Sequence, residues 1–339
     1  MSGRRDRRTT VLSVLAVGLP LVLSLVALNV GAYRIPPKAV FTTVAEAVFP
    51  GGDGPGPSPY ADILFRVRLP RLLLALFAGA ALAVSGASLQ ALFRNPLVFE
   101  FSLGISNGAA FGAALSIVFL GRGFPPQPAA FVFALLAVLL VVAIAGRSAS
   151  QVVTILLGGV IVSALFQALL SLVEVFANPY ALQSLVFWLM GSLGQATWSD
   201  LAVTLPVIGV GVAVLILMRW RLNVLSLGEE EARSLGLDTT RDKIAVIALA
   251  ALVTAAATAV MGVVSWVGLI VPHLVRMAVG ADNRKVVPLS AGYGAALLLL
   301  ADTVARGAAP FEIPVGILTS VVGIPFFIVL LKKSGRIWL

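Results

Sequence analysis

Four ionisable side chains, within or beside long apolar stretches, are the groups of this sequence that could do chemistry. They are Glu100, Glu174, Asp302 and His273, the last being the only histidine. A charge inside a membrane is costly and usually marks a function. Most of the four, however, lie near the ends of the apolar stretches, where water can solvate them. None is a convincing mid-membrane carboxylate of the kind that a proton- or sodium-coupled carrier uses.

The sequence offers no catalytic or metal-binding constellation. Cysteine is absent, which excludes disulfides and thiolate metal sites, and one histidine is too few for an imidazole cluster. The phosphate-loop pattern GxxxxGK[ST] and the zinc-protease pattern HExxH are also missing. We therefore predict that the chain is not an enzyme and has no catalytic residue, cofactor or metal of its own. If it takes part in active transport, the energy enters through another subunit.

Two arginines, Arg68 and Arg71, stand at the start of the second apolar stretch, with Pro70 between them. Proline suits the first turn of a helix, where its missing N–H needs no partner. Both cations would lie at the outer mouth of that helix, although lysine and arginine usually gather on the cytoplasmic side. Their spacing leaves two explanations open. They anchor the helix by reaching lipid headgroups, or they bind a partner outside the cell.

The elements that must position these residues are membrane-spanning helices. Of the 339 residues, 59% are hydrophobic and only 12% are charged, whereas a soluble domain is roughly a quarter charged. Runs of roughly 20 apolar residues predict an all-α integral membrane protein with about ten spans. We place them near 9–31, 70–92, 97–120, 129–146, 151–174, 199–218, 243–262, 267–280, 287–305 and 314–331, in a single transmembrane domain over residues 1–339.

The basic residues predict how the spans are oriented. The formal net charge of +9 comes in short clusters between apolar stretches, which indicates membrane topology rather than nucleic-acid binding. The arginines of residues 4–8 and the lysines at 332–333 place both termini in the cytoplasm. The first stretch is longer than the apolar core of a cleaved signal, about 7–15 residues, so we expect it to be retained. Residues 33–62 are then an extracellular linker.

Two further patterns bear on contacts. Small residues recur at every fourth position at Gly79, Ala83 and Ala87, which predicts helices in close backbone contact. The polar segment 219–243 reads as two short helices broken at glycines, with an apolar surface that includes Leu225, Ala232 and Leu235. An acidic run at 229–231 disfavours anionic lipid as its partner, so we predict a protein docking surface there.

Several stretches together resemble the iron-siderophore, haem and cobalamin permeases of type II ABC importers, a FecCD-like family. The resemblance covers nearly the whole chain, and the order and spacing of the stretches make it specific. They are RLPR (68–71), GAALAVSG (79–86), QALFRNPL (90–97), LGISNGA (103–109), WLMGSL (188–193), LN (222–223), GE (228–229), LG (235–236), VGLIVPHLVR (267–276), AD (301–302) with Arg306, and EIPVG (312–316). Glu100 departs from the pattern, because many relatives carry a small or polar residue there. This leaves the start of the third span open.

The resemblance implies partners as well as a fold. Members similar to this chain have ten spans and form a pair of permeases, so a homodimer is expected. The pair works with two ATPase subunits, which bind ATP and Mg, and with an extracytoplasmic substrate-binding protein. The implied function is translocation of an iron chelate (siderophore), haem or cobalamin across the cytoplasmic (inner) membrane by alternating access. Another metal cargo such as molybdate, or an ion-coupled secondary transporter, remains an alternative.

The resemblance also implies roles for particular residues. Arginines matching Arg68, Arg71 and Arg306 pair with glutamates of the binding protein. Segment 222–237 matches cytoplasmic coupling helices that sit in a cleft of the ATPase; the residues concerned are Leu222, Asn223, Leu225, Gly228, Glu229, Ala232, Leu235 and Gly236. The cytoplasmic end of the pathway is narrowed by Asn95, Leu97, Ser148, Ser150 and Gln151. The fifth span and residues 180–190 line that pathway. His273 belongs to a packing motif, so it does not favour haem.

Overall fold

Helices dominate the computed structural model, which describes residues 2–31, 33–48, 60–146, 152–309 and 311–334. Seven helices of this part of the chain are long and apolar enough to cross a membrane. They are α1 (Ser2–Asn29), α3 (Leu69–Leu92), α5 (Pro126–Ala145), α6 (Val152–Phe176), α8 (Trp198–Leu217), α11 (Thr239–Met261) and α13 (Asn283–Gly307). The shorter apolar helices are α4 (Ile105–Leu115, continued by the π-helical turn η3, Ser116–Leu120), α12 (Val267–Val279) and α14 (Val315–Ser334). The predicted all-α membrane fold is confirmed, and each predicted span coincides with one of these helices.

The third span begins later than predicted, at Ile105 rather than near residue 97. The side chain of Asn95 accepts the backbone N–H of Leu97 at 3.0 Å and so holds a turn directly after α3. A single 3-10 turn, η2 (Glu100–Leu103), follows and ends at Gly104 with φ +72°. Glycine adopts this left-handed conformation without steric cost. The turn and the glycine together keep the chain irregular until α4 begins.

Short helices fill the connections between spans. The predicted linker 33–62 contains α2 (Pro37–Val48), and a π-helical turn, η1 (Ile63–Arg68), leads directly into α3. After α6 comes α7 (Pro179–Leu189), which begins with the side chain of Asn178 accepting the N–H of Ala181. The polar segment after α8 forms α9 (Arg219–Leu225) and α10 (Glu229–Ser234). The two short helices predicted there are therefore present.

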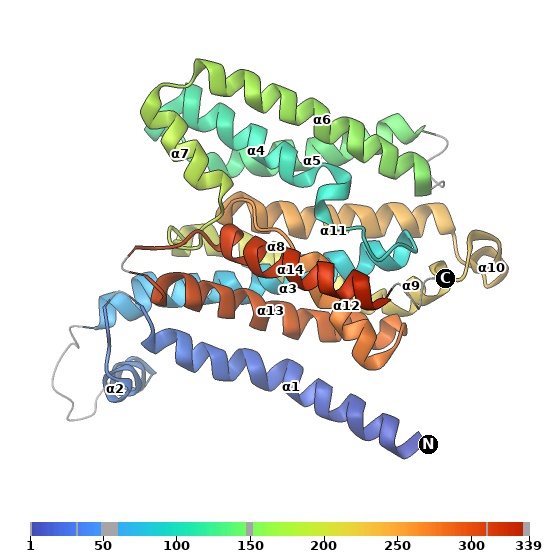
Figure 1. Ribbon diagram of the computed structural model, residues 1–339, viewed down its shortest axis with the longest axis horizontal. Coiled ribbons are helices and arrows are strands. Elements are labelled where there is room, and N and C mark those ends of the chain that lie inside the picture. The colour runs from blue at the N-terminus through green and yellow to red at the C-terminus, as the bar shows by residue number, and fades with distance from the viewer. Residues whose placement is uncertain (1, 32, 49–59, 147–151, 310, 335–339) are drawn as a thin grey trace.

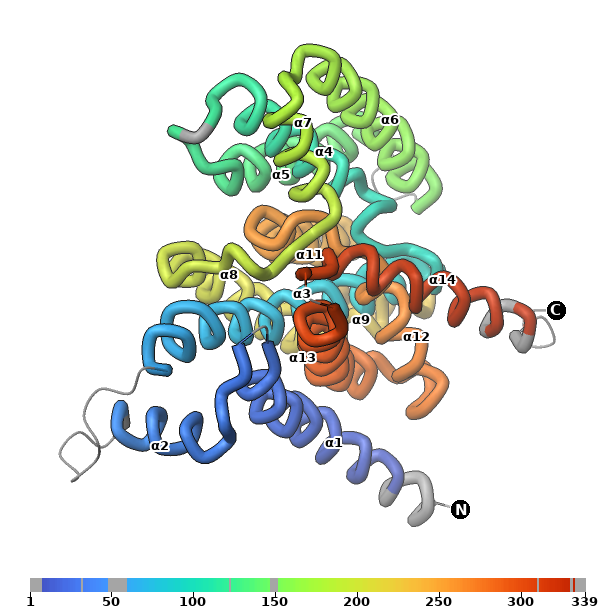
Figure 2. The backbone as a smooth tube through the Cα atoms, turned by 60° about the vertical axis from the view of Figure 1, so that its left-hand side comes forward, coloured from blue at the N-terminus to red at the C-terminus, as the bar shows by residue number. Residues whose placement is uncertain are grey.

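Helix α3 lies at the centre of the bundle. It packs against α8, α11, α12 and α13, and most of its residues are buried. Helices α4 to α7 form a group on one side of this centre, and α1 and α2 lie on the other side (Figure 2). Nine large apolar side chains of α1, among residues 8–29, are exposed, as suits a helix that faces lipid.

Two glycine contacts show how closely α3 approaches its neighbours. A Cβ atom added at Gly79 would lie 2.3 Å from the carbonyl oxygen of Gly294 on α13, and one at Gly86 would lie 1.9 Å from that of Gly268 on α12. A real Cβ atom could not be accommodated at these distances, so the two backbones can approach this closely only because each position is a glycine. The predicted close packing at Gly79 is thus present.

The residues predicted to contact partner proteins lie at opposite ends of the bundle. Helices α9 and α10 and the start of α1 are at one end, while α2, the start of α3 and the end of α13 are at the other (Figure 1). We call these the inner end and the outer end, after the predicted orientation.

Candidate functional site

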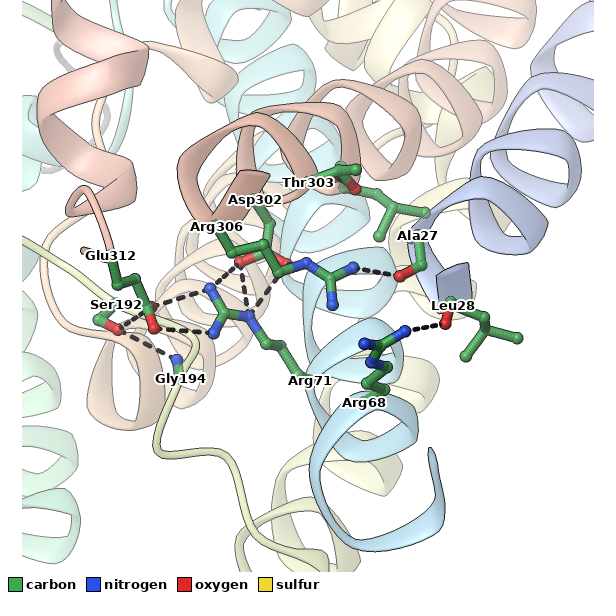
Figure 3. Close-up of polar contacts among 11 residues, drawn as sticks. Ala27, Leu28, Arg68, Arg71, Ser192, Gly194, Asp302, Thr303, Arg306 and Glu312 are labelled. Carbon is green, nitrogen blue, oxygen red and sulfur yellow. Dashed lines mark hydrogen bonds and ion pairs between the residues drawn. The ribbon is translucent and has the colours of Figure 1, made fainter. Parts of the chain in front are cut away.

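An ion-pair cluster occupies the outer end, centred on Arg71 in the first turn of α3 (Figure 3). Its Nε and Nη2 donate to Oδ1 of Asp302 on α13 at 2.9 and 2.7 Å. Its Nη1 and Nη2 donate to Glu312, in the segment between α13 and α14, at 3.0 and 2.8 Å. Asp302 is fully buried. One planar guanidinium therefore holds two carboxylates and joins α3, α13 and the start of α14.

Two further arginines fasten the end of α1 to the same cluster. Arg306 donates to the carbonyl oxygen of Ala27 at 2.6 Å, and its Nε lies 3.5 Å from Asp302. Arg68 donates to the carbonyl oxygens of Leu28 and Tyr33. The last carbonyl groups of a helix have no partner within it. The arginines supply that partner where α1 ends (Figure 3).

The predicted docking arginines are thus brought together, but their guanidinium groups are occupied inside the protein. Arg68 and Arg71 are only 4% and 6% exposed. By contrast, the side chain of Arg66, which was not among the predicted residues, is 80% exposed beside Asp62. Arg71 and Arg306 pair with the carboxylates of Asp302 and Glu312, while Arg68 binds backbone carbonyl groups nearby. Three cations and two carboxylates leave one positive charge in excess.

Glu312 connects the cluster to the wall of a cavity. The hydroxyl of Ser192 donates to it at 3.0 Å, and the N–H of Gly194 donates to that hydroxyl at 3.0 Å. Partial burial on its own would raise the pKa of Glu312, but the hydrogen bonds and charge of Arg71 outweigh it and hold the pKa below its ordinary value. The sequence analysis assigned no role to Glu312. Arg71, at the start of an apolar helix with no carboxylate close to it in sequence, was the signal that a distant acidic partner exists.

Glu312→Gln is expected to lower the thermal stability of the detergent-solubilised permease at neutral pH. The ionised carboxylate stabilises the folded state fully above about pH 4.3, the ordinary glutamate pKa. This stabilisation is lost as the pH falls through the lower pKa of the folded state. The melting temperatures of variant and wild type should therefore differ by a constant amount down to about pH 5 and converge only below the lowered pKa of the folded state. A difference that already fades between neutral pH and pH 5 would contradict this assignment.

The cavity at the outer end has a volume of about 800 Å³. It lies between α7, the turn after η3, the end of α11 and the start of α14. Four aromatic side chains contribute to the lining, namely Phe124, Tyr180, Phe187 and Trp188, together with polar ones such as Asn178 and Gln195. Among the described residues that line it, Glu312 is the charged one. Residues 180–190 contribute five side chains to this lining, and their place on a transport pathway stays a prediction.

The predicted coupling residues at the inner end divide into buried and exposed ones. Leu222, Leu225 and Ala232 are buried, whereas Leu235 is 56% exposed. The predicted apolar surface of Leu225, Ala232 and Leu235 is therefore not formed. The reason is the way α10 ends. The N–H of Leu237 bonds to the carbonyl of Ala232, and that of Gly236, at φ +85°, bonds to Arg233. In this helix-ending motif Leu237, rather than Leu235, packs back on the helix.

The remaining predicted residues have structural partners or lie outside the described chain. Glu229 accepts from Lys243 on α11 at 3.2 Å and from Arg233 at 2.8 Å. Gly228, with φ +151°, connects α9 to α10. Of the predicted cytoplasmic gate, Asn95 holds the turn after α3 and leaves Leu97 exposed. Ser148, Ser150 and Gln151 lie outside the described residues.

Comparison with known proteins gives consistent matches. The model of the FecCD transport family matches residues 19–333. The cobalamin import system permease protein BtuC of Halobacterium salinarum is 45% identical over 276 residues, covering 80% of this chain and 73% of that protein. The molybdate import system permease protein MolB of Haemophilus influenzae is 41% identical over 278 residues, covering 81% and 82%. A solved inward-facing structure, assigned to the metal-chelate type of ABC transporter, superposes with a TM-score of 0.83 at 35% identity, covering 97% and 99%.

Proposed function

The chain belongs to the FecCD transport family and is a permease subunit of an ABC importer in the cytoplasmic membrane, and we propose that its cargo is a bulky metal chelate or cofactor. Iron chelates (siderophores), haem and cobalamin form this class. The cargo crosses by alternating access, driven by ATP that is hydrolysed on a separate subunit.

The cavity at the outer end is the observation that carries the cargo class. Its volume of about 800 Å³ lies within the range of roughly 300–1,000 Å³ that suits organic ligands. A tetrahedral oxyanion of five heavy atoms needs on the order of 100 Å³, since one water takes about 30 Å³. The lining combines aromatic side chains with neutral polar ones, and the carboxylate of Glu312 is neutralised by its ion pair with Arg71. Molybdate is the second candidate, favoured by the similarity to MolB.

The two ends of the bundle suit two kinds of partner. At the outer end, the excess positive charge around Arg68, Arg71 and Arg306 attracts an acidic surface of an extracytoplasmic binding protein. At the inner end, segment 222–237 serves as the coupling helices for two ATPase subunits. The start of α1 and the end of α14 lie on this same side of the bundle (Figure 1), which supports our proposal that both termini are cytoplasmic.

A second copy of the chain completes the pathway. Large apolar side chains of α6 and α7 are exposed, including Val175, Phe176 and Tyr180. Tyr180 also lines the cavity, so a copy that packs there closes its open side. The inner end of that pathway is narrowed by Asn95 and Leu97, together with Ser148, Ser150 and Gln151.

Reconstitution of the complete transporter tests this proposal. The tagged chain, purified gently from its native membrane, is expected to bring with it an ATPase that contains a phosphate loop. In proteoliposomes with its binding protein, labelled siderophore chelates, haem, cobalamin and molybdate are compared. We expect vanadate-sensitive uptake of one of the bulky cargoes. Uptake of molybdate alone would overturn the cargo class, and uptake that ignores vanadate but collapses with an uncoupler would overturn the ATP-driven mechanism.

A further inference from the structure

The side chain of Asn223 joins α9 to the first residues of α13. Its Nδ2 donates to Oδ1 of Asp282 at 2.7 Å, and its Oδ1 accepts the backbone N–H of Asn283 at 2.7 Å. Asp282 also accepts the N–H of Arg284 at 3.0 Å and so caps α13. One amide thus uses both its nitrogen and its oxygen on a neighbouring helix.

The charge of Asp282 strengthens this connection. Hydrogen bonds from the side chain of Arg284 and from Asn223 lower the pKa of Asp282 to about 2. The carboxylate is therefore ionised at any physiological pH, and the bond from Asn223 is charge-assisted.

Apolar burial fixes α9 in the same place. Leu222, Val224 and Leu225 are buried, and α9 packs against both α3 and α13. Exposed large apolar side chains of this region include Trp220 in the first turn of α9, Leu227 between α9 and α10, and Leu235 directly after α10. The surface open to an ATPase is therefore formed by these side chains, while the core of α9 is fastened to the bundle.

Helix α13 continues from this attachment to the outer cluster. Its 25 residues span about 37 Å at 1.5 Å per residue. Near its middle, Gly294 is in backbone contact with Gly79 of α3. At its outer end, Asp302 and Arg306 belong to the cluster around Arg71. Both ends and the middle of α13 are thus held by specific contacts, and α3 and α13 form one stiff pair.

We propose that Asn223 is a positioning residue that fastens the coupling helices to α13, so that a movement imposed on α9 and α10 reaches the outer cluster along the α3–α13 pair. This inference rests on the proposed function, in which an ATPase docks at the inner end and a binding protein at the outer end. It assigns Asn223 to the connection between the two ends rather than to the contact with the ATPase.

The test uses the complete reconstituted transporter. The measured quantity is the stimulation ratio, which is the rate of ATP hydrolysis with loaded binding protein divided by the rate without it. Asn223→Asp replaces the donor by a carboxylate that faces Asp282. We expect the ratio to fall at least about 5-fold, toward one, since coupling free energies between sites correspond to about 5- to 150-fold. Asn223→Asp combined with Asp282→Asn exchanges donor and acceptor, and is expected to restore the ratio. Arg219→Gln, an exposed neighbour on α9, is the matched control and should keep the wild-type ratio.

The outcomes separate this inference from the proposed function. A wild-type transporter whose hydrolysis ignores the binding protein would contradict the proposed function itself. If the wild type responds, two results would overturn the role of Asn223. One is an unchanged ratio in Asn223→Asp. The other is an equal fall of both hydrolysis rates that the exchanged pair does not rescue. Should Asn223→Asp fail to assemble, Asn223→Ala, which removes both bonds without adding charge, is measured in its place with the same expected fall.

Discussion

Replacing Arg71 with alanine is expected to destabilise the folded permease by about 3–5 kcal/mol, the usual cost of removing one partner of a buried ion pair. Asp302 is fully buried and would keep only the weaker contact to Arg306 at 3.5 Å. Glu312 would lose the same guanidinium, so the segment that leads into α14 would lose its connection to α3. The fraction that remains monodisperse after heating in detergent, followed by size-exclusion chromatography, measures this loss.

Matched variants separate this effect from a general loss of charge. Arg66→Ala removes an exposed pair with Asp62 on the same side of the bundle and should change stability by no more than about 0.5 kcal/mol. Arg71→Lys keeps the charge but loses the planar fork that holds both carboxylates, and should lie in between. Equal stability of Arg71→Ala and Arg66→Ala would contradict the structural role of the cluster.

The helices could be predicted from the sequence because a membrane imposes a length. Each span needs roughly 20 apolar residues, and this requirement is visible in any single stretch. The start of α4 escaped the prediction because the apolar residues Val98, Phe99 and Phe101 continue the hydrophobic run, while a turn and a left-handed glycine interrupt the helix. Hydropathy depends on the side chains alone and contains no information on the backbone conformation.

The partners of the predicted site residues could not be derived from the sequence. Arg71 finds Asp302 and Glu312 across 231 and 241 residues of chain, and no periodicity connects positions so far apart. The resemblance placed Arg68, Arg71 and Arg306 in one region, which the structure also does, but their orientation toward the interior depends on where α1 ends. Docking of a binding protein on these arginines stays a prediction.

The inner end shows the same limit at shorter range. A helical repeat places Leu235 beside Ala232, yet the end of α10 puts Leu237 there instead. Asn223 was assigned to coupling by resemblance, but its use as a fastening to Asp282 depends on the position of α13, about 60 residues further on. Local patterns therefore identified which segments matter, and tertiary contacts decided what each side chain does.

Gly79→Val is expected to prevent recovery of a folded permease, because it separates the central helix pair. A side chain at this position of α3 meets the backbone of α13, with the carbonyl oxygen of Gly294 2.3 Å from the added Cβ. A flexible side chain could move aside, but a helix backbone held at both ends by Asp282 and Asp302 cannot. Overpacking usually costs about 1–3 kcal/mol, and a clash with backbone along a whole helix should exceed that range.

Gly18→Val is the matched control for this variant, because Gly18 lies in the lipid-facing helix α1 with no atom within 4 Å of an added Cβ. The same chemical change there should leave the yield of monodisperse protein within about 20% of wild type, since surface substitutions rarely exceed about 0.5 kcal/mol. Fluorescence-detected size-exclusion chromatography of both variants measures the difference. If Gly79→Val were recovered as well as Gly18→Val, the α3–α13 pair would be free to separate, and a stiff connection between the inner and outer ends would have no structural basis.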